Sequence, residues 1–160
     1  MVGMGFKCMD NKINKTVEEI KKLAEGEAFC ILPWIHMHPW PDGRVFTCCL
    51  SEQDTPIGNL NDMDLDECYN SDIMNSFRLD MLDNKKVSNC NRCYELEEVG
   101  HDTLRKRSND EFIFEKYGLH EDKSPIVQQT KLDGSLDEVH LTYMDIRFSN
   151  ICNMRCRTCG

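Results

Sequence analysis

The stretch Val139-His-Leu-Thr-Tyr-Met-Asp-Ile-Arg-Phe148 alternates apolar residues with others, and Cys152-Asn-Met-Arg-Cys156-Arg-Thr-Cys159-Gly160 follows it closely. The alternation predicts a β-strand that runs into a cysteine-rich loop. Cys152, Cys156 and Cys159 have C-x3-C-x2-C spacing. Three thiolates on one short loop can hold three irons of a [4Fe–4S] cube and leave the fourth iron open to a substrate or cofactor.

A zinc site is the alternative interpretation of this loop. Zinc prefers four nitrogen or sulfur ligands, which commonly arrive as two C-x2-C pairs. Here the spacing is unequal and no fourth ligand lies nearby in the sequence, since His140 falls on the preceding strand. The spacing and the strand before it therefore favour an iron–sulfur cluster.

A strand that leads into a C-x3-C-x2-C loop resembles the opening of the radical S-adenosylmethionine (radical SAM) enzymes. The resemblance implies that Cys152, Cys156 and Cys159 hold a [4Fe–4S] cluster whose open iron is chelated by S-adenosyl-L-methionine (SAM). Reductive cleavage of SAM would then generate a 5′-deoxyadenosyl radical that abstracts a hydrogen atom from the substrate. One departure is Thr158, which stands where this family often has an aromatic residue. We expect the chain to be the N-terminal fragment of a longer enzyme, because no further βα units follow.

The composition favours a globular protein and argues against a nucleic-acid-binding or membrane protein. Hydrophobic and charged fractions of 40% and 29% are those of a globular chain. The net charge of −9 argues against direct nucleic-acid binding. With no membrane-spanning run and no signal-peptide pattern, we expect a cytoplasmic protein without membrane contact. In that reducing compartment, ten cysteines indicate metal binding rather than disulfides.

A predicted β-hairpin lies near the start of the chain. Residues 29–40 form one apolar arm, residues 45–49 form the other, and Asp42-Gly43 between them is a strong turn signal. We expect Pro39 and Pro41 to confine the first arm to the edge of a sheet or to make it leave the sheet early. The two arms would bring one cysteine each, Cys30 and Cys48, towards one another.

These two cysteines and the later C-x2-C pair form a second candidate site, consisting of Cys30, Cys48, Cys90 and Cys93. The Cys30-x2-Pro-Trp opening, the Gly43-x4-Cys48 arm and the final pair resemble the twitch domain, the shortened relative of the SPASM domain of radical SAM maturases. Gly58-Asn59 and Arg78 also look like that family. The resemblance implies that the four thiolates ligate an auxiliary [4Fe–4S] cluster with no open iron, as an electron relay or a structural staple.

Several alternatives stay open at this second site. Four cysteines are also the ligand set of a structural zinc site, and twitch segments usually follow the barrel rather than precede it. Cys49 could replace Cys48 as a ligand, although neighbours on a strand point to opposite faces. Structural roles are expected for the remaining candidates: Cys68 buried in a helix, His36 and His38 as structural or exposed side chains, and Trp34 and Trp40 as a shield against water.

Helix signals occupy the rest of the chain. Thr16-Val-Glu-Glu19 has the form of a capping box, which predicts a helix to about Glu25. Helices are also predicted at 62–70, at 71–82 and at 94–107. The helix at 71–82 would direct four apolar residues to the core: Ile73, Met74, Phe77 and Met81. The basic run at 105–107 is interpreted as a helix end, where positive charge suits the helix dipole.

The sequence therefore predicts an α+β protein with a small cysteine-rich domain of a hairpin plus helices (twitch-like), followed by the first strand and cluster loop of a truncated (β/α) radical SAM barrel. The expected divisions are an N-terminal extension at 1–27, the twitch-like domain at 28–109, a linker at 110–138 and the barrel start at 139–160. The resemblance implies a peptide or protein substrate and a reductant such as a flavodoxin or ferredoxin. No residue is assigned a catalytic role. The competing hypotheses are a zinc-binding interaction module and a ferredoxin-like electron carrier.

Overall fold

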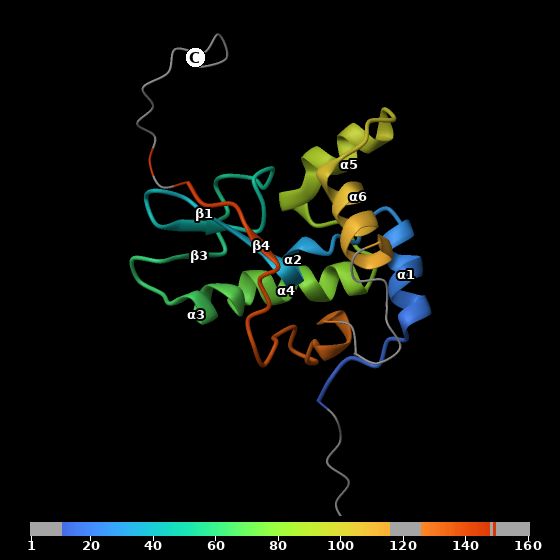
Figure 1. Cartoon of the computed structure of the whole chain (residues 1–160), viewed down its shortest axis with the longest axis horizontal. Coiled ribbons are helices and arrows are strands. Elements are labelled where there is room, and N and C mark those ends of the chain that lie inside the picture. Colours follow the sequence, from blue (N-terminus) through green and yellow to red (C-terminus); the bar gives the residue numbers. More distant parts are fainter. Residues whose placement is uncertain (1–10, 116–125, 148, 150–160) are drawn as a thin grey trace, which may run out of the picture.

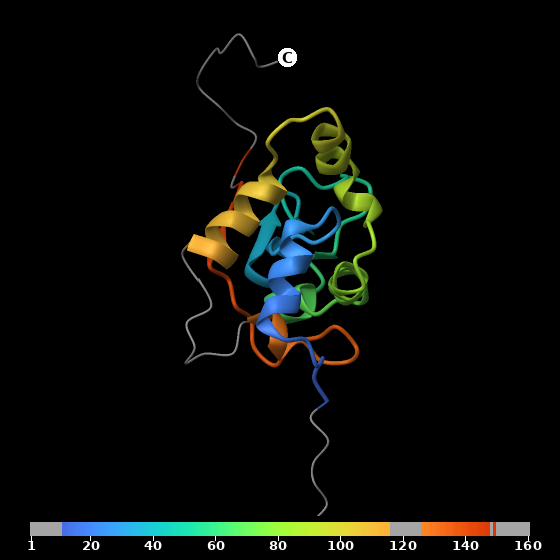
Figure 2. The same cartoon turned by 90° about the vertical axis from the view of Figure 1, so that its right-hand side faces the viewer.

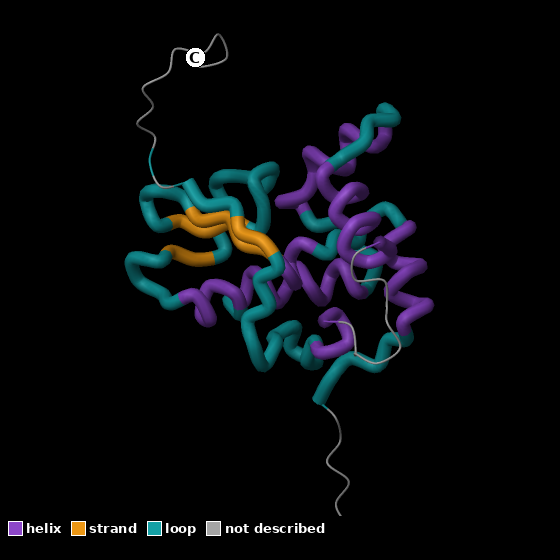
Figure 3. Tube along the Cα trace, in the orientation of Figure 1, coloured by secondary structure: helices purple, strands orange, loops and turns teal. Residues whose placement is uncertain are grey.

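The structure, a computed structural model, describes residues 11–115, 126–147 and 149. It is an α+β arrangement, as the sequence predicts, with the strands gathered at one end and most helices at the other (Figures 1 and 3). The elements in chain order are α1 (Val17–Glu25), α2 (Leu32–Ile35), β1 (His36–Pro39), β2 (Arg44–Phe46), β3 (Gly58–Asn59), α3 (Leu65–Tyr69), α4 (Asp72–Leu82), η1 (Ser88–Cys90), α5 (Asn91–Glu98), α6 (Leu104–Asn109), η2 (Asp110–Glu115), η3 (Ile126–Gln129) and β4 (Tyr143–Met144).

The strands form one mixed sheet in the order β3-β2-β1-β4. The predicted hairpin is confirmed, since β1 and β2 pair antiparallel and Gly43 in the turn has a φ of 92°. Of the two positions expected for the first arm, the edge is excluded because β4 pairs in parallel with the other side of β1. The early exit is confirmed, because the strand ends at Pro39. Pro39 is accommodated because it is the last residue of β1, where its carbonyl accepts a 3.3 Å hydrogen bond from the backbone N–H of Arg147.

Local capping signals set the starts of the helices. The capping box at Thr16 and Glu19 is present, with the Glu19 side chain 2.7 Å from the Thr16 backbone nitrogen. A second capping box starts α3, and Ser71 caps α4, close to where the sequence predicts these two helices. The single helix predicted at 94–107 is instead two helices, because Gly100 interrupts it with a φ of 83°.

The core lies between α2, α4 and the sheet. Met74, Phe77 and Met81 of α4 are buried as predicted, whereas Ile73 is 37% exposed and lies outside the core. The Arg78 side chain is also completely buried in this layer. It is therefore part of the framework that holds α4 beneath α2.

The segment predicted as a linker at 110–138 contributes to the same core where it is described. Phe112, Ile113, Val127 and Leu136 are all buried, and the Trp34 indole donates a 2.8 Å hydrogen bond to Thr130. Figure 2, seen from the helical end, places α1 and α6 in front of the strands. None of the helices in the described ranges is long and apolar enough to cross a membrane.

Candidate functional site

The four cysteines of the second candidate site line one cavity, although they come from three separate segments. Cys30 lies two residues before the short helix α2, and Cys48 follows β2. Cys90 ends η1, and Cys93 lies in the first turn of the adjoining α5. The prediction that Cys30 lies on a hairpin arm is therefore wrong, because Leu32–Ile35 form a helical turn before β1 begins. The rest of the cavity wall is supplied by Leu32, Leu50, Asn89, Leu104 and Arg105.

Burial keeps the four thiols protonated in the absence of a positive partner. It raises the pKa of Cys30 well above its ordinary value, and repulsion from the other three sulfurs adds to this effect. Burial also raises the pKa of Cys48 and of Cys90 to about 12 in each case. The pKa of Cys93 is raised for the same reason. Four thiolates at this place would therefore repel one another unless a cationic centre joined them.

An iron–sulfur cluster fits this donor set. A metal centre reverses the local preference by stabilising the deprotonated sulfur. Backbone hydrogen bonding by Leu32, Leu50 and Arg105 favours the thiolate forms of Cys30, Cys48 and Cys93 respectively. Such hydrogen bonds to sulfur are among the factors that set cluster potentials. Over the described ranges, no group of three or more His, Cys, Asp or Glu side chains is placed to hold a single metal ion.

Arg105 is the charged residue of the cavity wall, and its side chain is only 2% exposed. Its Nε donates a 2.9 Å hydrogen bond to Glu97, and its Nη2 pairs with the other oxygen of that carboxylate. Its Nη1 donates to the carbonyls of Gly26 and Phe29 at 2.9 and 2.8 Å. The interpretation of this residue as part of a helix end is wrong, because α6 starts at Leu104 and places Arg105 in its first turn.

Asparagine side chains hold the loops that carry the cysteines. The Asn109 oxygen accepts a 2.9 Å hydrogen bond from the backbone of Ile31, and its nitrogen donates to the Phe29 carbonyl at 3.0 Å. Asn89 donates a 3.1 Å hydrogen bond to the Thr55 carbonyl. The sequence did not predict these roles, nor that of Arg105, because the partners are backbone atoms far along the chain. The sequence feature that could have indicated these residues is a polar side chain next to a cysteine or at a helix end.

Two cysteines outside the proposed ligand set, Cys49 and Cys68, and the two tryptophans do not line this cavity. Cys49 is exposed and Cys68 is fully buried, as expected for residues outside the ligand set. Neither tryptophan lines the cavity, where three leucines face the thiols instead. Trp34 stacks on Phe29 at a centroid distance of 5.2 Å, and Trp40 packs edge-on against Phe46.

His36 and His38 are buried on β1, each at 1% exposure, so neither is the solvent-exposed residue that the sequence allowed. His38 Nδ1 lies 2.9 Å from the carbonyl oxygen of Asp145 and 3.3 Å from its carboxylate. His38 Nε2 has no hydrogen-bond partner among the described residues. The histidine therefore ties β1 to the segment that follows β4, away from the four thiols.

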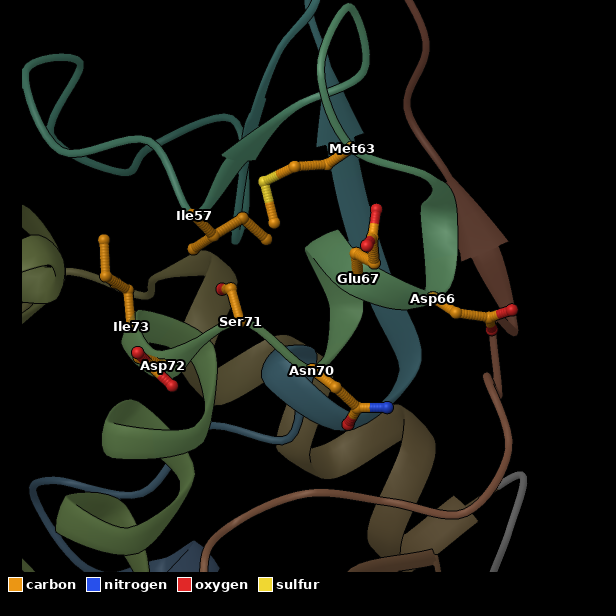
Figure 4. Close-up of a pocket in the computed structure, with 8 residues that line it drawn as sticks. All are labelled: Ile57, Met63, Asp66, Glu67, Asn70, Ser71, Asp72 and Ile73. Atoms are coloured by element: carbon orange, nitrogen blue, oxygen red, sulfur yellow. The ribbon is translucent and has the colours of Figure 1, made fainter.

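A second concavity is an open groove of about 720 Å³ between the loop after β3 and helices α3 and α4 (Figure 4). Ile57 and Met63 lie on one side of it in the close-up, and Asp72 and Ile73 on another. Its acidic residues stand in the first turns of α3 and α4, where the helix dipole favours negative charge. The groove contains neither cysteine nor histidine.

The first cysteine motif, Cys152, Cys156 and Cys159, lies outside the described residues. The strand predicted at 139–148 is shorter than expected, because β4 spans only Tyr143–Met144. The pairing with β1 continues on both sides of it, through Thr142 N to Ile35 O at 2.8 Å and through the contact of Arg147 with Pro39. The segment leading to the motif thus belongs to the same sheet as the hairpin.

One family model matches the chain. Residues 30–94 match SPASM, an iron-sulfur cluster-binding domain. The match begins at Cys30 and includes Cys48, Cys90 and Cys93, so it contains the whole thiol cavity except Leu104 and Arg105. It confirms the resemblance that the sequence pattern indicated. No curated protein and no solved structure matches the chain.

Proposed function

We propose that this chain, whose residues 30–94 are a SPASM-type iron–sulfur cluster-binding domain, belongs to a radical SAM enzyme with two [4Fe–4S] sites. The observation that carries the proposal is the convergence of Cys30, Cys48, Cys90 and Cys93 on one cavity. The family match rests on the residue pattern and the shared cavity on the arrangement of the segments, and both include the same four cysteines. Together they support one auxiliary cluster held by these four sulfurs.

The residues around the auxiliary site have separate tasks in this proposal. When bound, a [4Fe–4S] cluster would supply one-electron chemistry at this position. The four thiolates would bind it, and Leu32, Leu50 and Leu104 would exclude water from it. Asn109 would keep the loop of Cys30 in place through its hydrogen bonds to Ile31 and Phe29.

The second part of the proposal assigns Cys152, Cys156 and Cys159 to the cluster that binds and reductively cleaves SAM. It is supported by the C-x3-C-x2-C spacing and by the strand β4 that precedes the motif. A peptide or protein substrate and a flavodoxin or ferredoxin as reductant are part of the same proposal. Since β4 pairs with β1, the two cysteine motifs would be connected through one sheet.

The test is anaerobic reconstitution of the parental protein and of Cys93→Ala, Cys156→Ala and Cys49→Ala. Iron, sulfide and zinc are measured for each, with EPR spectra recorded with and without SAM. We expect about eight irons per chain in the parental protein, from two cubes of four. Cys93→Ala should lose the auxiliary signal, and Cys156→Ala should lose the signal that SAM perturbs. Cys49→Ala is the control, because this exposed cysteine should not affect either site.

Three outcomes would contradict the proposal or a part of it. Zinc in place of iron in the parental protein would identify a zinc-binding interaction module. Iron–sulfur signals that never respond to SAM in an enzyme with both clusters would indicate an electron carrier without SAM chemistry. Normal iron content in Cys93→Ala would remove that residue from the ligand set.

A further inference from the structure

The guanidinium of Arg105 is placed to act on the thiol site as a fixed positive charge. It lines the same cavity as the four cysteines, and its side chain is 2% exposed. Its electrostatic interaction extends to Cys30, Cys90 and Cys93. A charge inside a protein acts more strongly than one at the surface, because less water screens it.

The carboxylate of Glu97 pairs with Arg105, but the two opposite charges lie on different sides of the cavity. Glu97 lies on α5, the helix that also carries Cys93, so its negative charge is on that side of the cavity. Arg105 in turn points Nη1 at the carbonyls of Gly26 and Phe29, towards the loop that carries Cys30. The positive end of the pair therefore lies between the Cys30 loop and α5, and the negative end lies on α5.

We propose that Arg105 is a positioning residue that sets the reduction potential of the auxiliary cluster, an inference that rests on the proposed iron–sulfur function. One-electron reduction adds a negative charge to the cluster and its thiolates. A buried guanidinium beside them stabilises the reduced form more than the oxidised form, and so raises the potential. The hydrogen bonds to Glu97, Gly26 and Phe29 hold the guanidinium in place, so the charge requires no rearrangement when the electron arrives.

The match to the family model ends at residue 94, so Arg105 lies beyond it. The residue reaches the site because α6 packs against the loop of Cys30, where Arg105 and Asn109 both donate to the Phe29 carbonyl. Its neighbours Lys106 and Arg107 lie on the same helix but do not line the cavity. They are matched controls with the same charge.

The experiment is potentiometric titration of the auxiliary cluster, followed by EPR, in a background with Cys152, Cys156 and Cys159 all changed to Ala. This background removes the other predicted cluster, so that one signal remains. Arg105→Gln should shift the reduction equilibrium at least tenfold towards the oxidised form, a lowering of about 59 mV for a one-electron couple. Arg107→Gln removes a charge that is 66% exposed and should leave the potential unchanged.

Two further variants keep the test decisive if Arg105→Gln fails to retain its cluster. Arg105→Lys preserves the charge but not the planar fork, and should hold the potential close to the parental value. Glu97→Gln removes the opposing negative charge and should raise the potential. A merely structural role for Arg105 predicts none of these opposite shifts.

The results separate the two proposals. An auxiliary cluster whose potential is the same in the parental protein and Arg105→Gln would overturn the role of Arg105 and leave the cluster assignment standing. A potential in Glu97→Gln that falls or stays constant would also overturn it. A parental protein that binds zinc and no iron would overturn the proposed function, and this inference with it.

Discussion

Arg78 and Arg105 are both buried, yet their surroundings differ in one decisive respect. Arg78 donates to five oxygens, none of them a carboxylate: the carbonyls of Pro33, Tyr69 and Gly134 and the side-chain amides of Asn70 and Asn75. Arg105 forms a paired contact with the Glu97 carboxylate in addition to two carbonyls. The first arginine cross-links backbone segments, and the second belongs to an ion pair beside the thiols.

The charge states reflect this difference. Burial lowers the pKa of Arg78 to about 10, because the Tyr69 phenol offers little compensation. Burial also acts to lower the pKa of Arg105, but hydrogen bonding and attraction to Glu97 outweigh it and raise the pKa instead. A guanidinium can thus be buried with dipoles alone when its task is to hold the fold. Where the positive charge of the guanidinium acts on a site, a carboxylate partner keeps the guanidinium protonated.

The largest expected effect is at Arg78. Arg78→Met removes the common donor of five oxygens and should lower the free energy of unfolding by about 4 kcal/mol, since buried acceptors left without a partner cost about 1–3 kcal/mol each and some will find new donors. Urea denaturation followed by tryptophan fluorescence measures this. Arg78→Lys is the control and should recover only part of the loss. An unfolding free energy within 1 kcal/mol of the parental value would show that the network is dispensable.

The backbone on which Arg78 depends gives the next largest effect. Gly134 accepts a hydrogen bond from Arg78 and has a φ of 88°, and a Cβ there would lie 2.4 Å from the Asn75 carbonyl oxygen. Gly134→Ala should therefore destabilise the protein by about 3 kcal/mol through combined backbone strain and overpacking.

Gly100 is the matched control near Arg105, since it has a φ of 83° with nothing within 4 Å of the added carbon. Gly100→Ala should cost about 1 kcal/mol from backbone strain alone. Thermal or urea unfolding of both variants measures the difference between them. Equal losses would mean that the close approach at Gly134 relaxes without cost.

The next effect, at Glu97, is smaller than that of Gly134→Ala, and it depends on pH. Burial tends to raise the pKa of Glu97, but hydrogen bonds from Arg105 and Thr103 outweigh it, so the pKa is lowered in the folded protein. This stability is present above the unfolded pKa of about 4.3 and is lost as the pH falls through the folded value. Glu97→Gln should cost about 2 kcal/mol at neutral pH, with the difference shrinking below about pH 4.

Urea unfolding of the parental protein and Glu97→Gln from pH 7 to pH 3, in the same state of cluster loading, tests this prediction. Glu98→Gln is the control, because that side chain is 69% exposed. The loss in Arg78→Met should not diminish over the same range, since Arg78 has no carboxylate partner. A constant difference for Glu97→Gln would show that its carboxylate is not ionised in the fold.

The features that the sequence predicted well are those decided within a few residues. A capping box needs Thr16 and Glu19 three positions apart, and the hairpin turn needs a glycine at Gly43 with positive φ. The C-x2-C spacing of Cys90 and Cys93 is also a local pattern, whereas Cys30 and Cys48 stand far from it in the sequence and were added through the family resemblance. The assignment of Cys152, Cys156 and Cys159 stays a prediction.

The features that it predicted poorly depend on contacts between distant segments. Pro39 was compatible with an edge strand or with an early end of the strand. Only β4, about a hundred residues later, decides between them by pairing with the open side of β1. The segment at 110–138 has few local signals, yet Phe112, Ile113, Val127 and Leu136 are buried in the core. Neither outcome could be read from neighbouring residues, because both depend on which surfaces meet after the chain has folded.

Residue types and local spacing were therefore sufficient to indicate an α+β chain, its helix starts and four cysteines suited to one cluster. The tertiary structure alone decided that these cysteines share a cavity and that Arg105 lines it. The physical reason is that a thiol or a guanidinium carries the same chemistry anywhere in a sequence. Its neighbours, burial and opposing charge arise only when segments such as the loop of Cys30 and α6 are packed together.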